Sequence, residues 1–104
     1  MTIEIWTQQQ MITQGSKGLL LVDFYADWCG PCRMQVPVLE EIAEKHPSIK
    51  VVKINTEEAM DLTSRLEVTS LPTLALFKDG KEVCREVGLQ DVDGIEKMLA
   101  EVND

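Results

Sequence analysis

The sequence predicts an α/β fold in which helices cover both faces of a mixed β-sheet. Apolar, strand-like segments alternate with segments of helical periodicity over roughly the first two thirds of the chain, which is typical of parallel crossover units. The last third contains two strands joined by a tight turn, followed by a helix. The chain has 104 residues and no linker or repeat, so we expect residues 1–104 to form one domain.

The first predicted elements are a short strand, a helix and a central strand. Residues 3–6 are β-prone, and Thr7 with Gln10 three positions later has the form of a capping box at the start of a helix. Residues 15–18 begin and end in glycine and should end that helix. Residues 19–25 are apolar at almost every position, as expected for a strand covered on both faces.

The next segments continue the alternation. Apolar residues recur at helical spacing between residues 32 and 45, and Pro37 inside this segment should kink the helix. Residues 51–55 are a second buried strand, and residues 59–66 another helix.

The last third predicts a hairpin and a helix. Residues 73–77 and 82–87 are strands, and Asp79-Gly80 is the turn between them. Regular alternation in the second strand places Cys84 on one face with Glu82 and Glu86, opposite Arg85. Residues 91–102 close the chain as an amphipathic helix.

The amino-acid composition argues against some classes of binding partner. The formal net charge of −8 argues against binding to nucleic acid or to an anionic membrane, since both require a basic surface. No stretch approaches the roughly 18 apolar residues of a membrane span. Residues 1–6 show no basic and apolar pattern of a secretory signal, so we expect a cytoplasmic protein.

Two cysteines with two residues between them stand where a predicted strand gives way to a helix. The free N–H groups and partial positive charge of a helix N-terminus favour the thiolate of Cys29, which we expect to be the exposed nucleophile. Cys32, one turn into the helix, should be the protected resolving thiol. The alternative interpretation is a zinc site formed by Cys29, Cys32, Cys84 and His46.

These motifs together identify a family resemblance. The segments that carry it are residues 22–26, the Trp-Cys-Gly-Pro-Cys motif at 28–32, Pro37, residues 71–74, the turn at 77–80 and Val87-Gly88. Through these segments the chain resembles the thioredoxin family over nearly its whole length, and its first 18 residues match least.

The resemblance implies a fold and an activity. The fold would be a five-stranded mixed sheet flanked by four helices, and the activity protein disulfide reduction through a Cys29–Cys32 redox disulfide. Such a protein binds no cofactor or metal. It receives electrons from NADPH through a thioredoxin reductase, acts on disulfide-containing proteins, and is expected to be a monomer.

Asp23 is an ionisable residue in the middle of the apolar segment 19–25, where an unpaired carboxylate is costly. By resemblance it is the general base that deprotonates Cys32, through a water molecule. The alternative is a structural carboxylate paired with Lys53 on the neighbouring strand. Lys53 is expected to modulate Asp23.

The remaining site residues are expected to bind substrate. By resemblance the Leu71-Pro72 bond is cis and faces the sulfur atoms, which leaves the backbone of Ser70 and Leu71 free to pair with an extended substrate. Trp28 is expected on the docking surface, with core packing as its alternative. The full predicted set is Trp28, Gly30, Pro31, Ser70, Leu71, Pro72 and Gly88.

Two other functions fit the same fold. A disulfide oxidase or isomerase is one, although such families tend to place histidine between the cysteines and this chain has Gly30-Pro31. The other is a subunit that binds a partner without turnover. Cys84 is expected to behave as a small apolar residue in its strand, with a regulatory thiol as the alternative.

Overall fold

A computed structural model describes residues 3–102. Residues 1–2, part of the N-terminal segment considered above, and residues 103–104 lie outside this range. The elements are β1 (Glu4–Ile5), α1 (Gln8–Gln14), β2 (Leu19–Tyr25), α2 (Gly30–Lys45), β3 (Lys50–Asn55), α3 (Met60–Arg65), β4 (Thr73–Lys78), β5 (Lys81–Val87) and α4 (Val92–Ala100).

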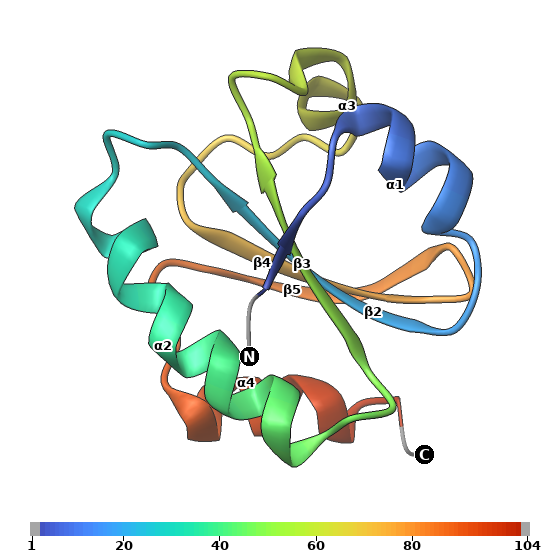
Figure 1. The fold of residues 1–104 in the computed structure, drawn as a ribbon, viewed down its shortest axis with the longest axis vertical. Helices are drawn as coiled ribbons and strands as arrows, with labels where there is room; N and C mark the ends of the chain where they lie inside the picture. The colour runs from blue at the N-terminus through green and yellow to red at the C-terminus, as the bar shows by residue number, and fades with distance from the viewer. Residues whose placement is uncertain (1–2, 103–104) are drawn as a thin grey trace.

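The sheet is mixed, as predicted. Its strand order is β1-β3-β2-β4-β5, in which β1, β3 and β2 run parallel and β4 is antiparallel to both β2 and β5. Helices α2 and α4 cover one face, and α1 and α3 lie on the other (Figure 1). The five strands and four helices of the described residues match the predicted architecture.

Strand β2 separates two apolar layers. Leu21 packs in the layer with α2 and α4, whereas Leu20 and Phe24 pack in the layer with α1 and α3. Every β2 residue after Leu19 is buried. Since side chains alternate along a strand, Asp23 lies on the same side of the sheet as Leu21, which is the side of α2.

Local sequence signals account for the element ends. The capping box at Thr7 and Gln10 is present. Asp79 and Gly80 both have positive φ, as a two-residue type I′ hairpin turn requires. Helix α2 begins at Gly30 rather than near residue 32, because Cys29 takes the N-cap position, and it continues through Pro37.

The predicted alternation in β5 is wrong at Glu82. Leu76 pairs with Cys84, but the next residue, Phe77, pairs with Glu82, so Val83 is the extra residue of a β-bulge. The bulge moves Glu82 to the face that carries Arg85, while Cys84 packs toward α4. A bulge has no composition signal in this strand, and regular alternation could not reveal it.

A buried glutamine joins α2 to the segment before α4. The Gln35 side chain is fully buried, donates to the Gln90 carbonyl at 2.9 Å and accepts from the Gln90 N–H at 2.8 Å. This pair of hydrogen bonds has the same donor and acceptor pattern as two paired strands, and it satisfies both backbone groups of Gln90. It fixes the loop that follows β5 against the helix that begins at the cysteines.

We predict that Gln35→Leu lowers the free energy of unfolding by roughly 1 to 3 kcal/mol, because the Gln90 backbone groups lose both partners. Urea unfolding followed by circular dichroism measures the change. Gln9→Leu, the same substitution at an exposed position of α1, serves as the control and should shift the midpoint little. Equal stability of wild type and Gln35→Leu would contradict the prediction.

Candidate active site

Cys29 and Cys32 form a disulfide at the N-terminus of α2, with their Cα atoms 5.3 Å apart. Cys29 is the N-cap residue, and its Sγ accepts a hydrogen bond from the backbone N–H of Cys32 at 3.3 Å. An anion at Sγ of Cys29 would therefore lie where the helix supplies free N–H groups and positive potential. The two predicted redox cysteines are brought together.

The predicted contrast in exposure between the two cysteines is wrong for this oxidised form. Cys29 is 5% exposed and Cys32 is 2% exposed. Both pack with Tyr25, and Leu71 packs against the same cluster. Because these neighbours cover both cysteines, the two side chains do not differ in exposure as their helix positions predicted. Cys29 is distinguished from Cys32 by its N-cap position instead.

Asp23 is fully buried, and within residues 3–102 neither of its carboxyl oxygens has a hydrogen-bond partner. Burial raises the pKa of Asp23 to about 7, and the charge of Lys53 acts in the opposite, lowering direction. The carboxyl group is thus poised to take up or release a proton near neutral pH.

Lys53 does not form the ion pair with Asp23 that the alternative interpretation required. The two residues are register partners across β2 and β3, but Nζ of Lys53 lies 4.2 Å from the centre of the Tyr25 ring. A cation over a ring face is attracted by its negative potential. A small cavity of about 100 Å³ opens beside Lys53 and Cys32, with room for water.

Trp28 lies on the surface, and the core-packing alternative is wrong. It is 68% exposed, and its Nε1 donates to Glu57 at 3.0 Å. Trp28 lines a surface groove of about 490 Å³ whose other residues include Val68, Ser70 and Leu71. Glu57, which orients the indole, was not predicted, because it follows β3 and no local motif links it to Trp28.

The loop before β4 runs along this groove. The Leu71-Pro72 bond is cis, as the resemblance implied. Thr73 Oγ1 donates to the Ser70 carbonyl at 2.6 Å, and the Gly88 N–H donates to the Pro72 carbonyl at 2.8 Å. Gly88 has a φ of 95°, a conformation that glycine adopts without strain.

A second groove lies at the side of α2. It has a volume of about 480 Å³ and is lined by Met34, Val38, Leu89, Gln90 and Asp91. Met34, which lines this groove, is exposed. Gly30 has open space where a Cβ would be, and Pro31 is exposed, so this part of the predicted surface is accessible.

The zinc alternative is not assembled. Within the described range no three His, Cys, Asp or Glu side chains gather as a metal site. His46 caps the far end of α2 and pairs with Glu96 at 2.8 Å. Cys84 is half-buried, and burial together with nearby glutamates raises the pKa of its thiol to about 11, as suits the predicted apolar role.

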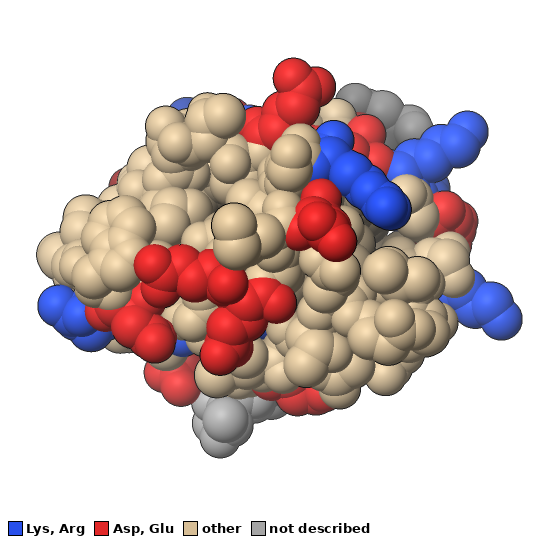
Figure 2. All heavy atoms as spheres, turned by 90° about the horizontal axis from the view of Figure 1, so that it is seen from above, with Lys and Arg blue, Asp and Glu red and all other residues tan. Residues whose placement is uncertain are grey.

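The surface charge agrees with the acidic composition. On the face seen from above, where α3 lies, acidic side chains form a contiguous group beside a broad uncharged area (Figure 2). Across residues 3–102 no helix is both long and apolar enough to cross a membrane.

Comparison with known proteins places these features in a family. The thioredoxin family model matches residues 3–101. The chain is 41% identical to a thioredoxin of Chlamydia trachomatis over 98 residues, covering 94% of this chain and 96% of that one. It is 48% identical to a thioredoxin of Alicyclobacillus acidocaldarius over 94 residues, covering 89% of each.

Solved structures agree in fold. A mutant thioredoxin from Halobacterium salinarum superposes with a TM-score of 0.87 at 39% identity, covering 98% of this chain and 90% of that one. The oxidised mitochondrial thioredoxin 3 of Saccharomyces cerevisiae gives 0.83 at 32% identity, covering 95% and 94%. The matched family model, the sheet order and the disulfide at the start of α2 agree, and the chain belongs to the thioredoxin family.

Proposed function

We propose that this thiol–disulfide oxidoreductase reduces protein disulfides, with Cys29 as the nucleophile and Cys32 as the resolving thiol. The observation that carries the proposal is the Cys29–Cys32 disulfide at the capped N-terminus of α2, beside an open groove. Helix position favours the Cys29 thiolate, and the short spacing places Cys32 within reach of Cys29.

The reaction proceeds in two exchanges. The Cys29 thiolate attacks one sulfur of the substrate disulfide, a mixed disulfide forms, and the other substrate sulfur leaves as a thiolate with the electron pair. Cys32 then loses its proton and attacks Sγ of Cys29, which releases the second substrate thiolate. The substrate gains two electrons, and the protein ends in the disulfide form seen in the structure.

Asp23 acts as the general base for Cys32 in this proposal. Its pKa of about 7 matches a group that accepts a proton near neutral pH, and both oxygens are free of other partners in the described residues. In this proposal a water molecule carries the proton from Cys32 to Asp23, and the cavity beside Cys32 and Lys53 offers room for water on the Cys32 side. Lys53 modulates the base by lowering the pKa of Asp23.

Substrate docks on the groove and the loop next to it. We assign Trp28, Gly30 and Pro31 to one side of the docking surface and Ser70, Leu71, Pro72 and Gly88 to the other. Of these residues, Trp28, Ser70 and Leu71 line the groove. The Leu71 backbone pairs with an extended substrate segment and aligns its disulfide with Cys29. Residues 1–104 act as one domain and a monomer.

The dithiol must be regenerated by a reductant. We assign this step to a thioredoxin reductase that uses NADPH, so the protein itself holds no cofactor. A reductase of protein disulfides works in a reducing compartment, which makes the cytoplasm its expected location.

Insulin reduction with NADPH and a thioredoxin reductase tests the proposed function, and turbidity follows the reaction. Equilibration with glutathione buffers distinguishes the oxidase alternative. We expect a reduction potential more negative than that of glutathione, because Gly30-Pro31 adds no cation to stabilise the thiolate. A potential above about −180 mV would favour an oxidase or isomerase.

Cys29→Ser should abolish insulin reduction, because no thiolate remains at the helix terminus to begin the exchange. Cys32→Ser should accumulate mixed disulfides, since Cys29 still attacks and nothing resolves the adduct. Non-reducing gels and mass spectrometry detect the adducts. Cys84→Ser is the matched control and should react like wild type. Adducts on Cys29→Ser instead of Cys32→Ser would reverse the two roles.

Asp23→Asn should slow release of substrate from the mixed disulfide on the order of tenfold or more at pH 7, because the general base is lost. Rapid-quench measurement of adduct decay gives this rate. The difference from wild type should shrink at alkaline pH, where Cys32 loses its proton to solvent. A variant that releases substrate as fast as wild type at pH 7 would show that Asp23 is not the base.

The pH dependence of the stability of Asp23→Asn tests whether the pKa of Asp23 is raised. The folded-state pKa of Asp23 is raised, so the native state binds the extra proton and stability falls as pH rises from about 4 to about 7. Between pH 5 and pH 8 this effect amounts to roughly 2 to 3 kcal/mol. Urea unfolding of the oxidised proteins should show that Asp23→Asn loses this part of the pH dependence. An unchanged pH profile would contradict the raised pKa.

A further inference from the structure

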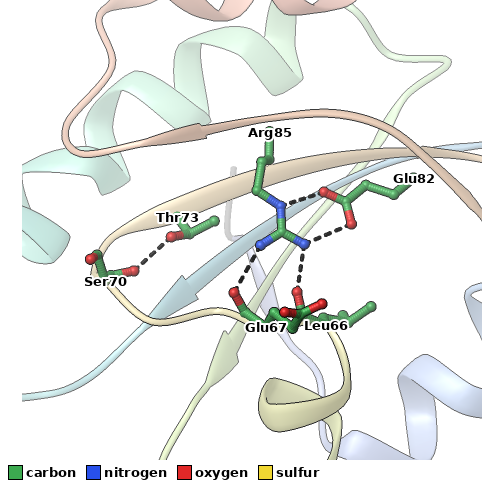
Figure 3. A network of polar contacts seen from close by, with 6 residues as sticks. All are labelled: Leu66, Glu67, Ser70, Thr73, Glu82 and Arg85. Carbon is green, nitrogen blue, oxygen red and sulfur yellow. Dashed lines mark hydrogen bonds and ion pairs between the residues drawn. The ribbon is translucent and has the colours of Figure 1, made fainter.

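Arg85 reaches from β5 to the end of α3 (Figure 3). Its Nη2 donates to the Leu66 carbonyl at 2.7 Å, and its Nη1 donates to the Glu67 carbonyl at 3.2 Å. Glu82 accepts from Nε at 2.5 Å and from Nη2 at 2.8 Å. All three guanidinium nitrogens are therefore engaged, which holds the side chain in one orientation.

The β-bulge makes this arrangement possible. Residues three apart on a regular strand point to opposite faces, but the extra residue Val83 places Glu82 and Arg85 on the same face. Glu82 can then hold the guanidinium in place from within the same strand. Without the bulge, Arg85 would have no carboxylate partner from its own strand at this position.

The backbone carbonyls at the end of α3 need a hydrogen-bond donor, and Arg85 supplies it. Glu67 has a φ of 55°, in the left-handed region usually occupied by glycine. The Val68 N–H returns to the Thr63 carbonyl, which completes a helix-ending turn. The carbonyls of Leu66 and Glu67 lie at the negative end of the helix, where a cation is favourable.

The loop that follows forms one wall of the groove at Trp28. Val68, Thr69, Ser70 and Leu71 line that groove, and Pro72 comes next. Arg85 holds the start of this loop, and the hydrogen bond from Thr73 to the Ser70 carbonyl holds its end (Figure 3).

We propose that Arg85 is a positioning residue for protein substrates. By fixing the carbonyls of Leu66 and Glu67 it sets the loop wall, residues 68–71, at the distance from Trp28 that an extended segment requires. It touches neither sulfur atom, so it affects docking and leaves the exchange chemistry unchanged. This inference rests on the proposed function, in which protein disulfides dock in the groove.

The test compares a large and a small disulfide. Reduced wild type and Arg85→Met are mixed with insulin or with 2-hydroxyethyl disulfide, and second-order rate constants are measured by stopped flow. The small disulfide does not need the loop wall, so its rate constant should stay unchanged. The rate constant with insulin should fall about 3- to 10-fold, as expected when one or two hydrogen bonds that hold the loop are lost.

Two further variants complete the design. Lys81→Met removes the same charge from an exposed position of β5 and should leave both rate constants unchanged. Arg85→Lys keeps the charge but lacks the planar fork, so a smaller loss with insulin is expected. It provides the same comparison should Arg85→Met fail to fold.

The outcomes are distinguishable. An unchanged rate constant with insulin in a folded Arg85 variant would overturn the proposal. An equal decrease with both disulfides would also overturn it, because Arg85 would then support the fold or the sulfur chemistry instead of docking. If wild type reduced neither disulfide, the proposed function would be wrong, independently of Arg85.

Discussion

The burial of β2 on both faces is the constraint on which the site depends. The strand is hydrogen-bonded to β3 on one side and β4 on the other, and an apolar layer covers each face. It cannot shift without breaking two ladders and exposing two cores. Its end therefore fixes where α2 begins, and so where Cys29 lies. Because Phe24 pairs with Thr73, the same strand also fixes the segment after Pro72.

This burial has a cost at Asp23. The apolar surroundings that hold β2 in place also destabilise an ionised carboxylate, which accounts for the raised pKa. A stability-optimised sequence would place an apolar residue there. The chain instead keeps a group whose ionisation weakens the fold above neutral pH, as expected where the group serves the reaction. Lys53 reduces this cost only in part, since its charge acts on Asp23 while its ammonium group lies over the Tyr25 ring.

The sequence predicted the features that depend on local patterns. The order of elements, the capping box at Thr7, the turn at Asp79-Gly80 and the cysteines at the start of a helix all follow from neighbouring residues. Features that depend on tertiary packing were missed. Contacts between distant segments bury Cys29, bring Glu57 to Trp28 and place Lys53 over the Tyr25 ring. The bulge at Val83 was missed because alternation assumes regular pairing.

The two parts of the site are consequently encoded in different ways. Residues 23–32 supply the sulfur atoms, the helix terminus and the buried carboxyl from one continuous segment. The loop wall, residues 68–71, depends instead on segments far apart in the sequence. These are the end of α3, the loop to β4 and the bulged edge strand β5. Helix capping and burial affect how readily sulfur reacts, whereas in the proposed function the position of the loop wall affects how a protein segment reaches it. If protein substrates dock against this wall as proposed, substitutions at Glu82 or Arg85 slow docking while the exchange chemistry stays the same.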